Sequence, residues 1–323
     1  MTTLRTPVCD LLGIEVPIVC APFGPLEEVE LAAAVCAAGG MGSLGTAVRP
    51  LPELREQWRR LRELTDRPFA INHTSRPLNE EAFEATLDFA PAAVSFHLSV
   101  PADHIKRAHD RGVAWIQQVM TLRQAEEAVA AGADVIVAQG GEAGGHGGWV
   151  GTMVLVPQVV DVAGRVPVLA AGGIADGRGL AAALTLGAQG ALVGTRFLAS
   201  EEMRIAEEWK RMIVSAGAED AVKVVNSGRV LPPYTLPVPP NEPRALRTAL
   251  VEQLARDPES IDPAEAGPRI VAAVLEGRGH EYLPFCGQSA GLVREILPAE
   301  EIVRRMVEEA VEALSAAGRA VVA

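Results

Sequence analysis

The sequence is short of cysteine, of basic charge and of long hydrophobic runs. Its four cysteines among 323 residues have neither the spacing of a metal site nor that of a disulfide framework. No apolar stretch is long enough to span a bilayer, and no basic segment followed by an apolar run stands at the amino terminus. The sequence therefore predicts a cytoplasmic protein with no metal centre and no membrane partner.

Acidic residues outnumber basic ones by 41 to 29, which gives a formal net charge of −12. This excess argues against binding to a nucleic-acid backbone or to an anionic membrane as the main function. It leaves room for a local site that binds one phosphate group. With 49% hydrophobic and 22% charged residues, the chain can form the large core of a single α/β barrel with an appendage.

Short apolar segments alternate with helical patterns along residues 1–200. Eight such alternations predict an α/β fold of the TIM type, a (β/α)8 barrel. A doubly wound open sheet is the alternative, and it is disfavoured because no GxGxxG turn follows the first strand. The segments that predict strands are Pro17–Phe23, Met41–Thr46, Phe69–Asn72, Ala93–Leu98, Ala114–Val119, Asp134–Ala138, Val168–Ala171 and Gly190–Gly194.

Three parts of the chain are expected. Residues 1–200 form the barrel, residues 201–285 form a smaller, mainly helical region that covers one barrel face, and residues 286–323 form a C-terminal segment. Within the second part, residues 231–243 contain too many prolines for a strand or a helix. A helix over about 299–317 has one apolar face and should pack back against the barrel. An earlier helix through Leu155 and Val159 is expected to keep Pro157 in its first turn.

A glycine-rich loop follows the sixth predicted strand. Residues 134–148 read DVIVAQGGEAGGHGG, so a buried strand leads into a loop that starts at Gln139 and holds six glycines. Such a loop is costly to order unless something packs against it, and it lets a ligand approach the backbone closely. Its two side chains able to carry out proton chemistry are Glu142 and His146. His146 is the candidate acid or base, and Glu142 either orients it or faces solvent.

Glycine also marks the loops after the seventh and eighth predicted strands, where many barrels bind a phosphate group. These loops hold Gly172 and Gly173 in one case, and Gly194, Thr195 and Arg196 in the other. Glycines expose backbone N–H groups, the helix that starts near Asp176 offers a positive dipole end, and Thr195 and Arg196 add donors. The pattern predicts a phosphate site, and the simpler alternative is that these glycines only form tight turns.

Amide and imidazole side chains follow several other strands and should meet at the same mouth of the barrel. Asn and Gln each offer a donor and an acceptor, which suits the pyrimidine edge of a flavin. His73 and His97 are equally well explained as structural residues. The side chains expected at the mouth are Asn72, Ser95, His97, Gln118, Gln139 and His146.

Longer motifs resemble a known enzyme family. The segments GADVIVAQGGEAGGHGG, VPVLAAGGIADGRGLAAALTLGAQGALVGTRFLAS, VSFHL and CGQSAGL are similar to those of nitronate monooxygenases, formerly called 2-nitropropane dioxygenases. The likeness runs from the first strand to the C-terminal helix and is weakest between residues 201 and 280. EAGGH and AAGGIADGRG also occur in enoyl-ACP reductase II, so they indicate the superfamily more than the substrate.

The resemblance implies an FMN-dependent oxidoreductase that oxidises alkyl nitronates or nitroalkanes with O2 to carbonyl compounds and nitrite. It makes His146 the catalytic histidine, which can remove the α-proton of a neutral nitroalkane. The implied partners are a small-molecule substrate and O2, with a homodimer as one option and no nucleic acid. The residues implied to bind FMN are Ala21, Pro22, Phe23, Asn72, Gln139, Gly144, Gly172, Gly173, Leu192, Val193, Gly194, Thr195 and Gln288.

Departures from the family pattern leave the substrate open. The family often has Gln at Cys20, Met at Phe23 and a larger residue at Gly147, and the first two positions are expected at the flavin face. Two alternatives use the same flavin barrel: an NAD(P)H-dependent reductase of enoyl thioesters (enoyl-ACP type) or quinones, and an acyl-CoA dehydrogenase. A carrier-bound acyl substrate would need basic residues outside the mouth, for which Arg76 and Arg229 are the candidates.

IMP dehydrogenase is a different barrel with a similar phosphate site. It needs a nucleophilic cysteine on the loop after the sixth strand. No cysteine lies between Cys36 and Cys286, so the sequence excludes this activity.

Overall fold

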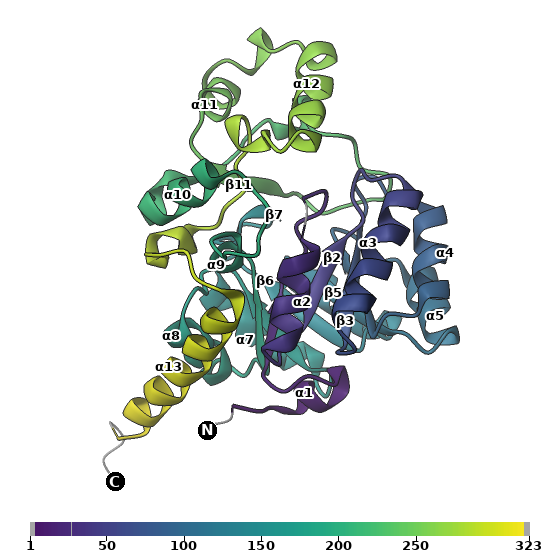
Figure 1. The fold of residues 1–323 in the computed structure, drawn as a ribbon, viewed down its shortest axis with the longest axis vertical. Coiled ribbons are helices and arrows are strands. Elements are labelled where there is room, and N and C mark those ends of the chain that lie inside the picture. Colours follow the sequence, from purple (N-terminus) through teal and green to yellow (C-terminus); the bar gives the residue numbers. More distant parts are fainter. Residues whose placement is uncertain (1–3, 27, 320–323) are drawn as a thin grey trace.

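A computed structural model describes residues 4–26 and 28–319 (Figure 1). Eight parallel strands form its central sheet, in the order β1-β9-β8-β6-β5-β4-β3-β2. The two ends of this order also meet, because Met41 donates a backbone hydrogen bond to Ile18 and accepts one from Cys20. The sheet thus closes as a barrel, as predicted, and is not an open doubly wound sheet. Its strands are β1 (Ile18–Cys20), β2 (Gly42–Gly45), β3 (Phe69–Thr74), β4 (Ala93–His97), β5 (Ala114–Val119), β6 (Val135–Gln139), β8 (Val168–Ala171) and β9 (Gly190–Val193).

Helices follow the strands and pack on the outside of the barrel. The C-terminal helix α13 (Ala299–Arg319) packs against α8 and α2 on the outside of the barrel (Figure 1). The predicted C-terminal helix therefore packs back on the barrel. Within the described residues, no helix has the length and apolar character needed to cross a bilayer. The other helices of the barrel part are α1 (Pro7–Leu12), α2 (Val29–Ala37), α3 (Leu51–Leu64), α4 (Glu80–Phe89), α5 (Ala102–Asp110), α6 (Leu122–Ala131), α7 (Thr152–Ala163), α8 (Gly177–Thr185) and α9 (Thr195–Leu198).

Apolar side chains fill the barrel on both sides of its strands. Small and branched residues such as Ala70, Ile116 and Val137 fill the interior, and Val8 and Leu12 of α1 belong to the same buried cluster. A larger cluster lies between the strands and the helices. Because α1 packs into one end of the barrel, the open mouth is the end formed by the carboxyl termini of the strands, where barrel enzymes carry their active sites.

The region over the mouth contains a small sheet that the sequence does not predict. Strand β11 (Glu242–Leu246) pairs antiparallel with β10 (Ala221–Lys223) on one side and with β7 (Gly145–Gly147), from the glycine-rich loop, on the other. β11 starts inside the 231–243 stretch, contrary to the expectation for that stretch. Pro243 is tolerated because its carbonyl accepts a hydrogen bond from Val224, which needs no N–H on the proline.

Helices and short turns make up the rest of this covering region, which lies above the barrel in Figure 1. The helices are α10 (Glu207–Ser215), α11 (Ala249–Arg256) and α12 (Pro263–Leu275). The 3-10 turns are Ala218–Asp220, Ser227–Arg229, Pro258–Ser260 and Gly279–Glu281. A further turn, Gln288–Leu292, lies in the C-terminal segment.

Helix α7 starts earlier than expected. It begins at Thr152, so Pro157 lies inside the helix and not in its first turn. The carbonyl of Met153 therefore lacks its helical donor, but Met153 is 71% exposed and water can take that place. The early start has a cause, since the Glu142 carboxylate accepts hydrogen bonds from the backbone N–H and the hydroxyl of Thr152, at 2.9 and 2.8 Å. Glu142 thus caps a helix, a role that the sequence did not indicate.

Candidate active site

A cavity of about 330 Å³ lies at the mouth of the barrel, between the strand ends and the covering region. Its size is that of a small-molecule site. Most of the residues predicted for the mouth line it together, although they come from the ends of seven different strands. These residues are Ala21, Pro22, Phe23, Asn72, His97, Gln118, Gln139, Gly144, His146, Gly172, Gly173, Leu192, Gly194 and Thr195.

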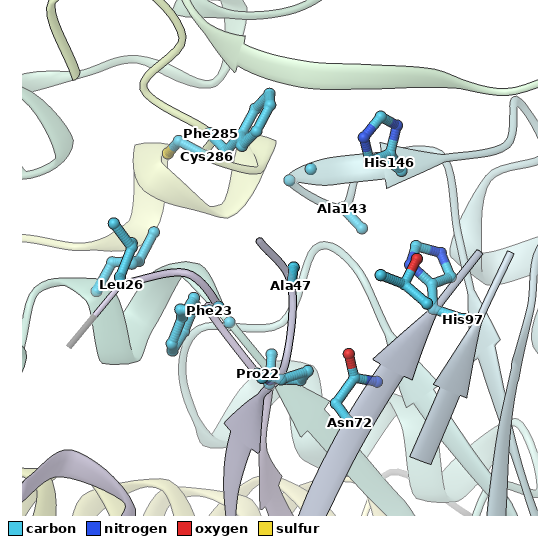
Figure 2. Close-up of a pocket in the computed structure, with 18 of the residues that line it drawn as sticks. Pro22, Phe23, Leu26, Ala47, Asn72, His97, Ala143, His146, Phe285 and Cys286 are labelled. Carbon is cyan, nitrogen blue, oxygen red and sulfur yellow. The ribbon is translucent and has the colours of Figure 1, made fainter. Parts of the chain in front are cut away.

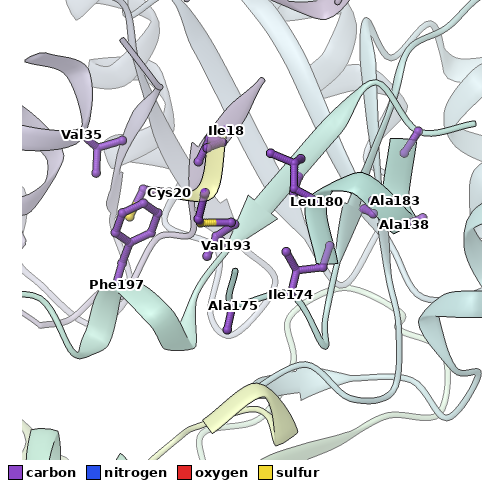
Figure 3. Packing of buried hydrophobic residues seen from close by; sticks show 14 of the residues in the cluster. Ile18, Cys20, Val35, Ala138, Ile174, Ala175, Leu180, Ala183, Val193 and Phe197 are labelled. Carbon is purple, nitrogen blue, oxygen red and sulfur yellow. The ribbon is translucent and has the colours of Figure 1, made fainter. Parts of the chain in front are cut away.

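Other predicted positions do not line the cavity, and Ser95 of β4 is one of them. Val193 and Cys20 are each 1% exposed and pack outward against the helices, near Phe197 (Figure 3). Successive residues of a strand point to opposite faces, so Cys20 points away from the mouth and its expected place at the flavin face is wrong. Gln288 contributes through its backbone, whose N–H donates to the carbonyl of Glu142 at 2.9 Å.

Two glycines of the loop differ in what they do. A Cβ at Gly144 would lie 2.6 Å from the carbonyl carbon of Cys286, so only glycine allows these two segments to approach. A Cβ at Gly147 would meet Gln139 and Lys223 at an ordinary 3.6 Å, and Gly147 does not line the cavity. The small size of Gly147 therefore does not enlarge the pocket.

The glycine-rich loop is held by long side chains of the covering region. Arg244 donates to the carbonyl of Gly141 from Nε and Nη2, at 3.1 and 2.7 Å. Lys223 Nζ donates to the carbonyls of Gly147 and Gly148, at 3.0 and 2.7 Å. These contacts join residues about 75 to 103 positions apart in the sequence, so a local sequence pattern cannot predict them. They fix the loop that carries His146.

His146 points into the cavity from β7, with Asn72 and His97 at the ends of barrel strands across from it (Figure 2). Its Nδ1 lies 3.5 Å from the Tyr234 hydroxyl, and that hydroxyl donates to Asn241 Oδ1 at 2.7 Å. Because Tyr234 uses its one hydrogen on Asn241, His146 must supply the hydrogen in any bond with Tyr234. This arrangement favours a proton on Nδ1 and leaves Nε2 as the acceptor.

Charge and burial keep the His146 imidazole neutral. Burial first, and then the positive charge of Arg76, lower the pKa of His146 from 6.5 to about 3. At neutral pH the ring can therefore accept a proton, but its basicity is weak.

The other two histidines considered from the sequence, His73 and His97, lie in different surroundings. His73 is 1% exposed and hydrogen-bonds the hydroxyls of Thr46 and Thr86 at 3.2 and 2.9 Å, so it is a structural residue. His97 lines the cavity, and burial lowers its pKa to about 4. Its Nε2 is buried and has no hydrogen-bond partner among the described residues.

Unpartnered polar atoms show where a ligand fits. Gln139 donates its amide to the carbonyl of His146 at 2.9 Å, and its side chain also interacts with the His97 imidazole, an effect that raises the pKa of His97. Neither the buried Gln139 Oε1 nor His97 Nε2 makes a hydrogen bond of normal geometry in the described part of the chain. Such atoms are rare in folded proteins unless a ligand or water meets them. Asn72, held by a 2.9 Å hydrogen bond to Ser95 Oγ, is a third polar group at this wall. The wall suits a heterocycle with several donors and acceptors.

The two glycine loops lie on the same cavity, with Gly172 and Gly173 at φ values of +102° and +76° that favour glycine. Thr195 Oγ1 accepts from the N–H of Gly287 at 2.8 Å, which leaves its hydrogen for another acceptor. Two predicted contributions to a phosphate site are wrong. The first N–H of α8 donates to Glu309 and the next two to Asp176, and Arg196 donates to the carbonyl of Glu295, away from the cavity.

The covering region gives the cavity an apolar wall that the sequence did not assign to the site. Helical periodicity marks α12 as amphipathic but does not say what its apolar face meets. Arg76, on a barrel loop, and Tyr234, on a loop of the covering region, also lie at this site. Arg229 instead forms a salt bridge with Glu259. The apolar lining includes Trp209, Leu231, Ile270, Val274, Leu283 and Phe285.

Comparison with known proteins settles the family. The model of the family described as nitronate monooxygenase matches residues 5–84 and 73–309. The chain belongs to the nitronate monooxygenase family. A nitronate monooxygenase of Paraburkholderia phytofirmans is 34% identical to it over 93% of each chain. An octahydro-1H-indene-4-carboxyl-CoA dehydrogenase of Mycobacterium tuberculosis is 37% identical over 78% of this chain and 68% of its own length.

Solved structures agree with this placement. FabK from Thermotoga maritima superposes with a TM-score of 0.87 at 33% identity, over 99% of this chain and 100% of that one. Nitroalkane oxidase from Streptomyces ansochromogenes gives a TM-score of 0.80 at 29% identity, over 96% and 99%. The protein is thus a TIM-barrel oxidoreductase of the nitronate monooxygenase family.

Proposed function

We propose that the protein is an FMN-dependent nitronate monooxygenase that oxidises alkyl nitronates with O2 to a carbonyl compound and nitrite. The observation that carries the proposal is a neutral His146 on an immobilised glycine loop, facing a wall with unpartnered polar atoms on Gln139 and His97. Membership of the family supports it.

The described residues fit a flavin mononucleotide. Asn72, His97 and Gln139 would hold the ring system through their amide and imidazole groups. The backbone at Gly172–Gly173, with Gly194 and Thr195, would hold one terminal phosphate. When bound, the flavin supplies the transfer of electrons between substrate and O2.

His146 favours nitronates over neutral nitroalkanes. A general base works best when its pKa lies near the working pH, and the pKa of His146 is lowered to about 3. It is therefore a weak base for the α-proton of a nitroalkane. A nitronate has already lost that proton, so His146 needs only to hydrogen-bond it.

The cofactor is tested by heat release from the purified protein followed by chromatography. We expect FMN. Release of FAD, or a protein that never binds flavin, would contradict the proposal.

A reductase or dehydrogenase acting on acyl thioesters is the second candidate, and the apolar wall favours it. The side chains of α12 and Leu283 add apolar lining that suits an acyl chain longer than a two- or three-carbon nitronate. FabK and the carboxyl-CoA dehydrogenase named above are also similar to this chain over most of its length. Reduction of the flavin by NADH or NADPH would distinguish a reductase from a nitronate monooxygenase.

A further inference from the structure

Arg76 is a cation in the cavity wall that the proposed function leaves without a role. It follows β3, lines the cavity, and has its guanidinium carbon 3.6 Å from the centroid of the Tyr234 ring. Its Nε and Nη1 are buried and have no hydrogen-bond partner among the described residues. Within the same residues it forms no salt bridge. Buried guanidinium nitrogens such as these usually have a partner.

The neighbouring cationic side chains, Lys223 and Arg244, have hydrogen-bond acceptors within the protein. Lys223 Nζ donates to three backbone carbonyls. Arg244 likewise donates to the carbonyls of Gly141 and Ala221. Arg76 differs because Tyr234, through its ring face and a side-chain hydrogen bond, compensates its charge only in part. Its Nε and Nη1 donors remain available to a ligand.

Nearby carboxylates do not fill this place. Glu242 influences Arg76 at a distance, but its own carboxylate accepts from the Ser227 hydroxyl at 3.1 Å. Burial lowers the pKa of Arg76, although arginine keeps its charge at neutral pH. The result is a charged, half-buried donor group near His146, whose pKa it lowers.

We infer that Arg76 binds the anionic group of the substrate, a planar group with two oxygen atoms such as a nitronate or a carboxylate. A guanidinium matches two such oxygens better than a point charge does. The carbon chain then lies toward the apolar wall of α12, so the substrate class is a small organic anion with an apolar substituent. The inference deepens the proposed function and rests on it for the identity of the anion.

Binding of propionate to the oxidised holoenzyme tests the inference without turnover. Propionate has the shape and the two oxygens of ethylnitronate but cannot be oxidised in the same way. Isothermal titration should show that Arg76→Ala weakens propionate binding by about 10- to 100-fold, the effect of losing a charge-assisted hydrogen bond. Arg62→Ala is the matched control, because Arg62 also stacks on an aromatic ring, 4.6 Å from the Phe69 centroid, but is exposed and away from the cavity. It should leave binding unchanged.

Two results would overturn the inference. One is propionate binding to Arg76→Ala as tight as to the unaltered protein. The other is loss of FMN from Arg76→Ala with full retention in Arg62→Ala, which would assign Arg76 to the phosphate of the cofactor. If Arg76→Ala does not fold, Arg76→Lys and Arg76→Gln are compared, and equal binding by these two refutes a role for the charge. Arg76-dependent propionate binding without nitronate oxidation would uphold this inference and refute the proposed function.

Discussion

The state of His146 depends on residues from several parts of the chain. The sequence predicts the residue itself, because it is one of two titratable side chains on a loop of glycines. It does not predict that Tyr234, in the proline-rich stretch, lies beside Nδ1, or that Arg76 lowers the pKa. Those contacts join segments about 70 to 88 residues apart, and no periodicity in the sequence reports them.

Replacing His146 separates its two possible roles. In His146→Ala we expect turnover of neutral nitroalkanes to fall by about 10²-fold, the lower end of the effect of a positioned base, because a pKa near 3 makes His146 a weak one. Turnover of preformed nitronates should fall less, and the flavin spectrum should be kept. Steady-state kinetics on both forms of one substrate measures this, with the surface variant His109→Ala as control. Equal losses on both forms would instead assign His146 to binding.

His73 makes folding stability depend on pH. Burial lowers its pKa from 6.5 to about 3, so between these values the unfolded chain binds a proton that the folded protein does not. Stability is therefore unaffected by this group above pH 6.5 and declines as pH falls toward 3, by up to about 1.4 kcal/mol per pH unit. Urea unfolding between pH 7 and pH 4 should show a flatter dependence for His73→Gln. An unchanged slope would contradict the assignment.

Among the elements, the barrel strands and most helices are predictable because their patterns are local. Each predicted strand is found within about four residues of its expected ends, since short Val- and Ile-rich runs between turns are typical of buried parallel strands. The small sheet is not predictable, because β7 and β10 are three-residue strands that gain their identity only by pairing with β11. The start of α7 is missed for a similar reason, since its cap is Glu142, ten residues upstream.

The capping carboxylate Glu142 should matter for both the helix and the loop. In Glu142→Ala we expect a loss of about 1 kcal/mol in stability, together with weaker retention of flavin, because the loop carrying Gly144 and His146 is no longer fixed to α7. Asn79→Ala is the matched control, since Asn79 caps α4 by accepting from Ala82 at 3.0 Å, away from the mouth. It should lose similar stability but no flavin affinity. Equal flavin affinity in both variants would contradict this role for Glu142.

For the whole molecule, closing the barrel brings the strand ends together, which is why most of the predicted mouth residues lie in one cavity. The rest of the cavity comes from the covering region, and its docking is set by long-range contacts such as those of Lys223 and Arg244. The apolar wall could therefore not be placed from the sequence, although α12 itself carries an amphipathic pattern. The choice between nitronate and thioester chemistry depends on this wall and on His146 together.

Anaerobic stopped-flow mixing of the oxidised holoenzyme tests that choice most directly. The enzyme is mixed with propyl-2-nitronate, with NADH and with NADPH in separate experiments, and flavin absorbance is followed. We expect rapid reduction by the nitronate and none by either nicotinamide, with nitrite formed once oxygen is admitted. Rapid reduction by NADH or NADPH without a response to the nitronate would contradict the proposed function and identify a reductase.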